Sequence, residues 1–134
     1  MKTVEELNTW CTGLPALLGF EVTESDAGRL HARMPVRPEL LAPNGYLHAA
    51  SVIGLADSAC GFGTMSDLPA SATGFTTIEL KSNFIGTALE GMLLCRARRV
   101  HGGRSTQVWD AEVAVESTGK TIALFRCTQM ILYK

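Results

Sequence analysis

The sequence predicts an α+β protein in which a curved antiparallel β-sheet wraps around one long central helix. Three features of the chain carry this prediction. Residues 47–65 are apolar nearly all round, as expected of a helix that is buried on most sides. Four segments with strand character follow, and turn residues separate them into an antiparallel arrangement. A sheet that curls around the helix is the compact way to bury it.

The N-terminal part of the chain predicts a helix and a hairpin. Residues 3–18 carry apolar side chains three or four positions apart, which favours a short amphipathic helix, although a glycine and a proline within the segment oppose it. Residues 20–25 and 29–36 have extended character, and the turn between them ends in Gly28. We expect a β-hairpin here, followed by a loop over residues 37–45.

The central helix is distinguished by its lack of charge. Asp57 and Asp67 are the only ionised side chains within residues 40–78. A stretch of about 17 apolar residues is too short to cross a bilayer, so we expect the helix over residues 47–65 to be enclosed by the sheet. Glycines within it lower helix propensity by roughly 1 kcal/mol each, which predicts close approach by another backbone. These glycines are Gly54, Gly61 and Gly63.

The second half of the chain supplies the predicted sheet. Its segments with strand character are residues 75–85, 92–101, 105–116 and 121–133. In the third segment apolar and polar side chains alternate, which predicts a strand with one face packed against the core and the other exposed to solvent. Gly102-Gly103 predicts a two-residue hairpin turn, and a four-residue turn joins the third and fourth segments. We expect these strands to form a four-strand antiparallel meander.

Length, charge and cysteine content narrow the classes of function. A chain of 134 residues with 46% hydrophobic residues predicts one domain over residues 1–134. A formal net charge of −1 gives no basic surface for nucleic acid and no polybasic signal for an anionic membrane. The four cysteines form no CxxC pair, and no secretory pattern begins the chain. We expect a soluble protein of the reducing cytoplasm, without nucleic-acid or membrane partners.

The predicted architecture is the hotdog fold, and several motifs resemble one family that has it. His48–Ala59 resembles the signature of phenylacetate-type (PaaI-like) hotdog acyl-CoA thioesterases, which runs from His-Gly-Gly to Leu-Ala-Asp with the same spacing of nine from His to Asp. Thr76–Phe84 and Gly103–Thr106 resemble the third strand and later hairpin of that family, and the likeness covers roughly residues 15–132. The resemblance implies hydrolysis of acyl-CoA thioesters, without a metal or prosthetic group, at sites shared between two subunits.

Helix geometry predicts shared sites independently of the family. His48 and Asp57 are nine residues apart, so they point to opposite sides of a helix and lie roughly 13 Å apart along its axis. Two copies related by a two-fold axis bring the helix start of one subunit to the helix middle of the other. We therefore expect a homodimer as the catalytic unit. As a separate expectation, two such dimers form a tetramer.

Asp57 is the predicted catalytic carboxylate. A partly desolvated carboxylate beside a cleft suits attack on a thioester, either directly through an anhydride or through an activated water molecule, and the sequence leaves both routes open. The structural alternative is a carboxylate held by backbone N–H groups or by an arginine. Thr77 aligns with the family's hydroxyl position on the neighbouring strand, where it would hold the attacking water. Its alternative role is that of a strand-favouring residue.

The start of the central helix is the predicted oxyanion site. His48 would orient the thioester, or it is only a satisfied histidine at a helix entrance. The free N–H of Ala49 would stabilise the thioester oxygen, with help from the helix dipole. Ala49 and Ala50 replace two glycines of the family, which keeps the donor and narrows the passage for the substrate. Ala42 stands where the family has an asparagine, and Asn44 is the candidate substitute.

The remaining predicted residues contact the substrate. Asn44 and Gly45 form a turn dipeptide before the helix, and Tyr46 would line the acyl pocket or pack in the core. Arg104, beside Ser105 in the later hairpin, would bind the coenzyme A phosphates at an exposed rim. A further cation for the phosphates would be Arg98, Arg99 or Lys120. The alternative is that most of these basic side chains are only solvated on the strand faces.

Motifs of other chemistries are missing. The chain contains no Gly-x-Ser-x-Gly elbow, Walker lysine motif or Gly-x-Gly-x-x-Gly turn, and its three histidines form no metal-ligand cluster. Two alternatives stay open because a fold alone does not define a reaction: a non-catalytic hotdog module that binds acyl-CoA, and a hotdog enoyl-CoA hydratase or dehydratase. The placement of His48 and Asp57 favours hydrolysis of an acyl-CoA thioester, and the sequence leaves open an aryl, short-chain or medium-chain acyl group.

Overall fold

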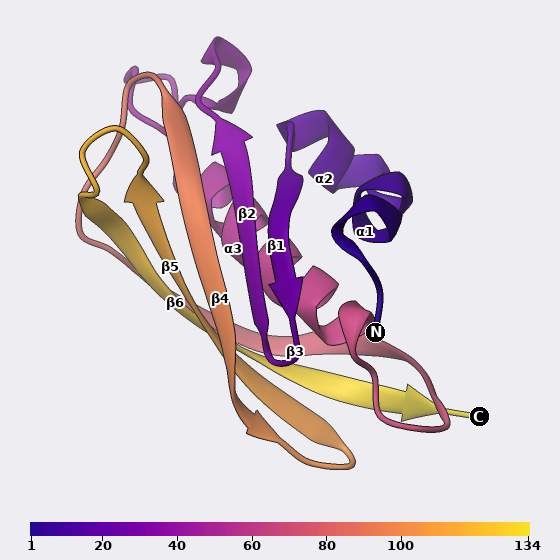
Figure 1. Ribbon diagram of the computed structural model, residues 1–134. Helices are drawn as coiled ribbons and strands as arrows, with labels where there is room; N and C mark the ends of the chain where they lie inside the picture. Colours follow the sequence, from indigo (N-terminus) through magenta and orange to yellow (C-terminus); the bar gives the residue numbers. More distant parts are fainter.

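A single antiparallel sheet wraps around one long helix in the computed structural model, which describes residues 1–134 (Figure 1). The helix is α3, Ala49–Ser66. The sheet has six strands in the spatial order β1-β2-β4-β5-β6-β3. This arrangement confirms the predicted α+β hotdog fold. The strands are β1 (Glu21–Asp26), β2 (Arg29–Pro35), β3 (Ala72–Phe84), β4 (Met92–Gly102), β5 (Thr106–Val115) and β6 (Thr121–Tyr133).

The order of the strands corrects the predicted four-strand meander. β4, β5 and β6 follow one another in space, whereas β3 lies at the sheet edge beside β6, and β4 lies beside β2. Tight turns indicate which strands are neighbours, and among the last four strands such turns join only β4 to β5 and β5 to β6. Residues 85–91 instead carry the chain from the β3 edge to the middle of the sheet. β3 and β6 are far apart in the sequence, so no local pattern predicted their pairing.

The predicted N-terminal helix is two helices, α1 (Val4–Trp10) and α2 (Gly13–Leu18). Cys11 and Thr12 between them adopt extended backbone angles. Gly13 follows with a φ of +63°, outside the right-handed helical region. The glycine that opposed a continuous helix in the sequence therefore marks the place where the chain changes direction. A short 3₁₀ helix, Pro38–Leu40, precedes α3.

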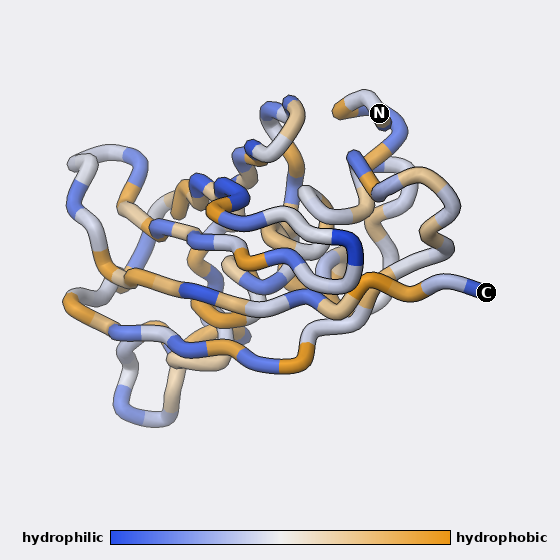
Figure 2. Tube along the Cα trace, turned by 90° about the horizontal axis from the view of Figure 1, so that it is seen from below, coloured by the Kyte–Doolittle hydropathy of each residue, from blue (hydrophilic) through white to orange (hydrophobic).

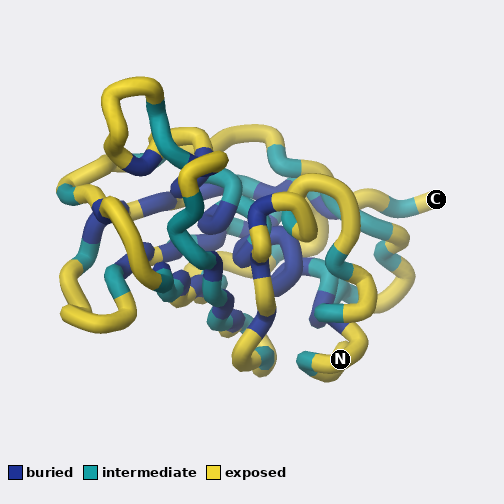
Figure 3. Tube along the Cα trace, turned by 90° about the horizontal axis from the view of Figure 1, so that it is seen from above, coloured by how far each residue is buried: buried dark blue, intermediate teal, exposed yellow.

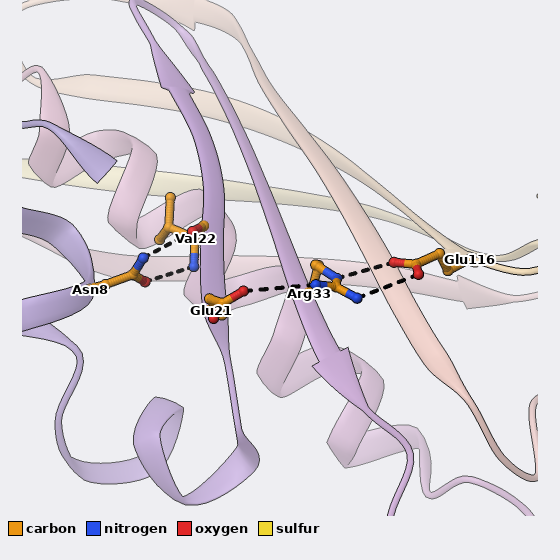
Figure 4. Close-up of polar contacts among 5 residues, drawn as sticks. All are labelled: Asn8, Glu21, Val22, Arg33 and Glu116. Carbon is orange, nitrogen blue, oxygen red and sulfur yellow. Dashed lines mark hydrogen bonds and ion pairs between the residues drawn. The ribbon is translucent and has the colours of Figure 1, made fainter. Parts of the chain in front are cut away.

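One side chain of α1 fixes it to the sheet. Asn8 Nδ2 donates to the Val22 carbonyl at 3.0 Å, and the Val22 N–H donates to Asn8 Oδ1 at 2.8 Å (Figure 4). On the neighbouring strand, Arg33 lies 4.0 Å from Glu21 and 3.1 Å from Glu116. The β1 edge of the sheet is therefore partly covered by its own chain.

Side chains, rather than another backbone, approach the glycines of α3. A Cβ on Gly63 would lie 2.6 Å from Trp109 Cη2, and one on Gly54 would lie 2.7 Å from Leu18 Cδ1. At Gly61 the neighbour is again a side chain. The prediction of close backbone approach is wrong, because the glycines make room for large side chains of the core.

The alternation along the strands separates the core from the outer face. Hydrophobic and hydrophilic residues alternate along the strands (Figure 2), and the buried residues gather in the interior around α3 (Figure 3). The buried residues of β5 are every second one over most of its length: Gln107, Trp109, Ala111 and Val113, followed by Ala114. None of the helices combines the length and the hydropathy that a membrane span requires.

Candidate active site

The start of α3 leaves one backbone donor free. His48 caps the helix, and its Nδ1 accepts from the Ala50 N–H at 2.9 Å. Ala49 is exposed, and its N–H has no acceptor within the chain. The Leu40 carbonyl accepts from the His48 N–H at 3.0 Å and from Ser51 Oγ at 2.8 Å, which fixes the helix start in place. The Ala49 N–H is therefore an unpaired donor at the exposed start of the helix.

Asp57 lies in the third turn of α3 and is partly buried. Its Oδ1 lies 3.3 Å from Oγ1 of Thr77 on β3. It forms no ion pair with any cation of the chain. Burial raises the pKa of Asp57 above its usual value, and a hydrogen bond from Thr77 would oppose that rise. The site thus contains a desolvated carboxylate without a compensating positive charge.

His48 and Asp57 of one chain lie far from each other. His48 is the N-cap of α3 and Asp57 follows nine residues later. This spacing corresponds to roughly 13 Å along a helix, on opposite sides of the axis. A site that uses both side chains needs a second copy of the protein.

Asn44 supports the turn before α3. Asn44 Oδ1 accepts from the Tyr46 N–H at 3.1 Å, and Gly45 has a left-handed backbone with a φ of +90°. The Ala42 N–H donates to the Tyr46 carbonyl at 2.7 Å. The Asn44 side chain is therefore engaged in the turn itself. Tyr46 is 51% exposed, so it does not pack in the core.

Arg104 and Ser105 form the turn between β4 and β5. The Gly103 N–H donates to the Thr106 carbonyl at 2.9 Å, so the two residues between them make the reversal. The prediction that Gly102-Gly103 would be the turn is wrong by two residues. Neither of these glycines has a positive φ, because the turn requires no left-handed residue at that place.

Arg104 borders a pocket of about 820 Å³ at the C-terminal end of α3. Its guanidinium carbon lies 5.0 Å from the centre of the Tyr133 ring, and the Tyr133 hydroxyl donates to the Arg104 carbonyl at 2.6 Å. Arg99 also borders the pocket and lies 4.0 Å from Asp67. Gln107 contributes to the lining from β5.

Two of the other candidate phosphate-binding cations lie away from this pocket. Arg98 borders a separate pocket on the other face of the sheet and lies 3.9 Å from Asp110. Lys120 precedes β6, at the opposite end of β5 from Arg104. Arg98 and Lys120 are therefore not placed at the rim that Arg104 forms. Successive residues of a strand point to opposite faces, and the length of β5 separates its two turns.

Two buried glutamines near the site were not among the residues predicted from the sequence. Gln129 is 0% exposed, and its Oε1 lies 2.6 Å from Thr77 Oγ1. Gln107 lies opposite Gln129 in the sheet and accepts from Trp109 Nε1 at 2.9 Å. Each stands at an inward position of an alternating strand, where an apolar side chain is expected. A polar glutamine at an inward position of the alternation is the feature of the sequence that would have identified both residues.

The cysteines lie in or near the core as free thiols. Cys60, Cys95 and Cys127 are buried, and Cys11 is partly exposed. Burial raises the pKa of Cys95 to about 12 and that of Cys60 well above its usual value. Such neutral thiols pack as small hydrophobic side chains. No group of three or more His, Cys, Asp or Glu side chains is placed to hold a metal ion.

The sheet, its enclosed helix and the carboxylate on that helix place the protein among the hotdog-fold enzymes. Residues 44–127 match the family described as the thioesterase superfamily. The chain belongs to the thioesterase superfamily, and it is a thioester hydrolase. The predicted thioesterase superfamily and the predicted class of enzyme are confirmed.

Individual relatives are similar over most of the chain. The 1,4-dihydroxy-2-naphthoyl-CoA hydrolase of Listeria monocytogenes is 28% identical over 116 residues, which cover 87% of this chain and 93% of the relative. The structure of a thioesterase variant from Pseudomonas aeruginosa has a TM-score of 0.91 and 28% identity, and covers 98% of this chain and 95% of its own. A thioesterase family protein from Silicibacter pomeroyi has a TM-score of 0.83 and 32% identity, with coverage of 92% and 91%.

Proposed function

We propose that the protein hydrolyses acyl-CoA thioesters to a free acid and coenzyme A, with Asp57 as the catalytic carboxylate. The observation that carries the proposal is the position of Asp57, partly buried in an apolar helix, beside Thr77 and without a neutralising cation. A desolvated charge of this kind costs stability. A chemical role accounts for its presence there.

The proposed catalytic unit is a homodimer, and two dimers form the proposed tetramer. β3 is an edge strand of 13 residues, and one side of its backbone has no partner strand. Ile78 is 53% exposed and Leu80 is 40% exposed on this strand. An unpaired edge with exposed apolar side chains is a template for pairing with a second copy. A two-fold axis at β3 would create two equal sites.

In the proposed site the thioester lies between the start of one α3 and the middle of the other. The Ala49 N–H donates to the carbonyl oxygen, and His48 orients the thioester beside it. Thr77 holds a water molecule, whose oxygen bonds to the carbonyl carbon while its proton passes to Asp57. The tetrahedral intermediate then loses the C–S bond, and Asp57 returns the proton to the coenzyme A sulfur.

A second route uses the same residues. Asp57 attacks the carbonyl carbon directly, the C–S bond breaks, and water cleaves the resulting anhydride. Neither route requires a metal ion or a prosthetic group. In the direct route, water attacks Cγ of the Asp57 anhydride, so a single turnover in ¹⁸O-labelled water places the label in Asp57 and releases unlabelled acid. The water route instead places the label in the acid product.

The phosphates of coenzyme A are proposed to bind at the pocket beside Arg104. The guanidinium is exposed and has no carboxylate partner within the chain, so it is free to bind an anion, with Ser105 as a neighbouring donor. The exposed Tyr46 and the turn at Asn44 and Gly45 are proposed to contact the substrate at the helix start. The Listeria relative is named for an aromatic acyl-CoA, so aryl groups join short and medium acyl chains as candidate substrates.

Thiol release from a panel of aryl, short-chain and medium-chain acyl-CoAs tests the proposal. Asp57→Ala is expected to lower kcat by a factor on the order of 10² or more, with the oligomer intact. The exposed Asp26→Ala is the matched control and should leave kcat unchanged. Equal turnover by wild type and Asp57→Ala would reject the assignment. Binding without thiol release would favour the non-catalytic module, and hydration of an enoyl-CoA would favour the hydratase.

A further inference from the structure

A row of buried polar side chains extends across the sheet from Asp57. Thr77 on β3 lies opposite Gln129 on β6, which lies opposite Gln107 on β5. Gln129 is 0% exposed and Gln107 is 1% exposed. Thr77 Oγ1 lies 2.6 Å from Gln129 Oε1 and 3.3 Å from Asp57 Oδ1. Thr77 therefore contacts the candidate catalytic carboxylate and a buried amide at the same time.

The Thr77 hydroxyl has a single proton to donate. Its 2.6 Å distance to Gln129 suits a hydroxyl that donates to a carbonyl oxygen, because amide N–H donors lie farther away, near about 2.9 Å. The 3.3 Å distance to Asp57 is long for a bond between oxygens. The proton therefore lies in the contact with Gln129, and Thr77 turns a lone pair toward Asp57.

We propose that Gln129 is a positioning residue, which holds the Thr77 proton away from Asp57 and thereby keeps Asp57 a stronger base toward the attacking water. This inference rests on the proposed function and deepens it. A carboxylate that accepts a hydroxyl hydrogen bond is stabilised in its ionised form and is a weaker base. With its proton held by Gln129, Thr77 instead accepts one hydrogen of the water whose other hydrogen passes to Asp57.

The second half of the Gln129 amide supports this assignment. Nε2 of Gln129 is buried and has no hydrogen-bond partner. A buried amide with an unpaired donor destabilises the fold relative to an apolar side chain of similar size. The contact with Thr77 is the only side-chain hydrogen bond that Gln129 makes, so this contact is what the amide contributes to the protein.

Few other titratable groups face Asp57. Within the same chain, the group that faces Asp57 is the thiol of Cys60, which also contacts Cys127. An ionised Cys60 thiolate would repel the Asp57 carboxylate. Burial raises the pKa of Cys60 well above its usual value, so the thiol is neutral where Asp57 titrates. In the proposed dimer His48 of the second copy also faces Asp57, so the titrations below are repeated in a His48→Gln background.

Carbon-13 NMR titration of the aspartate carboxyl groups tests the inference without any substrate, with the Asp57 signal assigned from its loss in Asp57→Asn. Gln129→Met is expected to lower the pKa of Asp57 by about 0.5 unit or more, because the freed Thr77 proton then goes to the carboxylate. In a Thr77→Val background the same substitution should have no effect. Gln107→Met is the matched control, since it removes the neighbouring buried amide without touching Thr77.

Gln129→Leu provides a second variant in case the methionine protein fails to fold, and circular dichroism verifies folding of each. An unchanged or raised pKa of Asp57 in a folded Gln129 variant overturns the inference. An equal shift in Gln107→Met also overturns it, because loss of any buried amide would then have the same effect.

The pH profile of kcat/KM separates this inference from the proposed function. The acid limb of the Gln129→Met profile should move to lower pH by the amount seen in the NMR titration. An active wild type and an active variant with the same acid limb overturn the inference and leave the proposed function intact. Absence of thioester hydrolysis by the wild type overturns the proposed function, and the NMR titration still decides whether Gln129 controls the Thr77 proton.

Discussion

Two carboxylates of this protein have opposite surroundings. On the outer face of the sheet, Asp110 accepts from Arg126 Nη2 at 2.8 Å, and this hydrogen bonding lowers the pKa of Asp110. Asp57 has no cation beside it, and burial raises its pKa. The ionised form is therefore favoured by folding at Asp110 and disfavoured at Asp57, so the two groups contribute to stability with opposite sign.

Asp57→Asn is expected to raise the melting temperature at neutral pH while it abolishes most of the activity. A carboxyl whose pKa is raised in the folded state destabilises the fold once the pH exceeds the unfolded pKa of about 3.9, because ionisation then favours the unfolded chain. Below that pH both states are protonated, and the difference from the wild type disappears. Thermal unfolding followed by circular dichroism across this pH range is the measurement.

Asp110→Asn is the control for this experiment. A lowered folded pKa stabilises the fold above the unfolded pKa, and that stability is lost as the pH falls through the folded pKa. This variant should therefore melt below the wild type at neutral pH and approach it at low pH. A lower melting temperature for Asp57→Asn at neutral pH would show that Asp57 is compensated after all.

Among the elements, α3 depends on glycine to fit inside the sheet. Trp109 lies against Gly63, is 0% exposed, and is held by the hydrogen bond from its Nε1 to Gln107 at 2.9 Å. Leu18 lies against Gly54 with the free end of its side chain. The same kind of close contact therefore involves a fixed ring at one glycine and a flexible methyl group at the other.

Gly63→Ala is expected to lower the free energy of unfolding by about 1–3 kcal/mol, because the new methyl group overlaps a ring that has no room to move. This loss outweighs the roughly 1 kcal/mol that alanine contributes to helix propensity. Gly54→Ala is the matched control, with a net change below about 1 kcal/mol, because Leu18 adjusts and the propensity gain is the same. Urea unfolding compares the two, and equal losses would contradict the difference in rigidity.

The two edges of the sheet differ in how well they are covered, and this difference predicts which edge binds a second copy of the protein. Asn8 of α1 occupies both backbone groups of Val22 on β1. β3 at the opposite edge has no such cover, and it carries exposed Ile78 and Leu80. Edge strands without cover are prone to pair with other strands. Association through β3 is therefore the expected arrangement.

The double variant Ile78→Lys, Leu80→Lys is expected to shift the protein toward monomers in light scattering coupled to gel filtration, because charge on an edge strand opposes its pairing. Loss of thioesterase activity should accompany the loss of the dimer, since each proposed site uses two subunits. Leu124→Lys is the matched control on β6, where the side chain is 49% exposed away from that edge. A fully active monomer would contradict the shared site.

Local patterns were sufficient for most of the elements. Three elements were predicted because each depends on residues that are neighbours in the sequence. They are the uncharged stretch that forms α3, the alternation that buries Trp109, and the turn after β5. Asp57 could be singled out in the same way, as a charge within an apolar helix. The break between α1 and α2 was only partly predicted. Gly13 opposed a continuous helix but did not indicate where α1 would end.

The amino-acid sequence alone was enough for the class of fold, the enclosed helix and the candidate carboxylate, because periodicity and charge are local properties of the chain. The pairing of β3 with β6, and with it the contact of Thr77 with Gln129, was decided only in three dimensions. These strands are far apart in the sequence, and their register depends on how the sheet closes around α3 rather than on any turn between them. The polar surroundings of Asp57 are therefore a property of the folded chain.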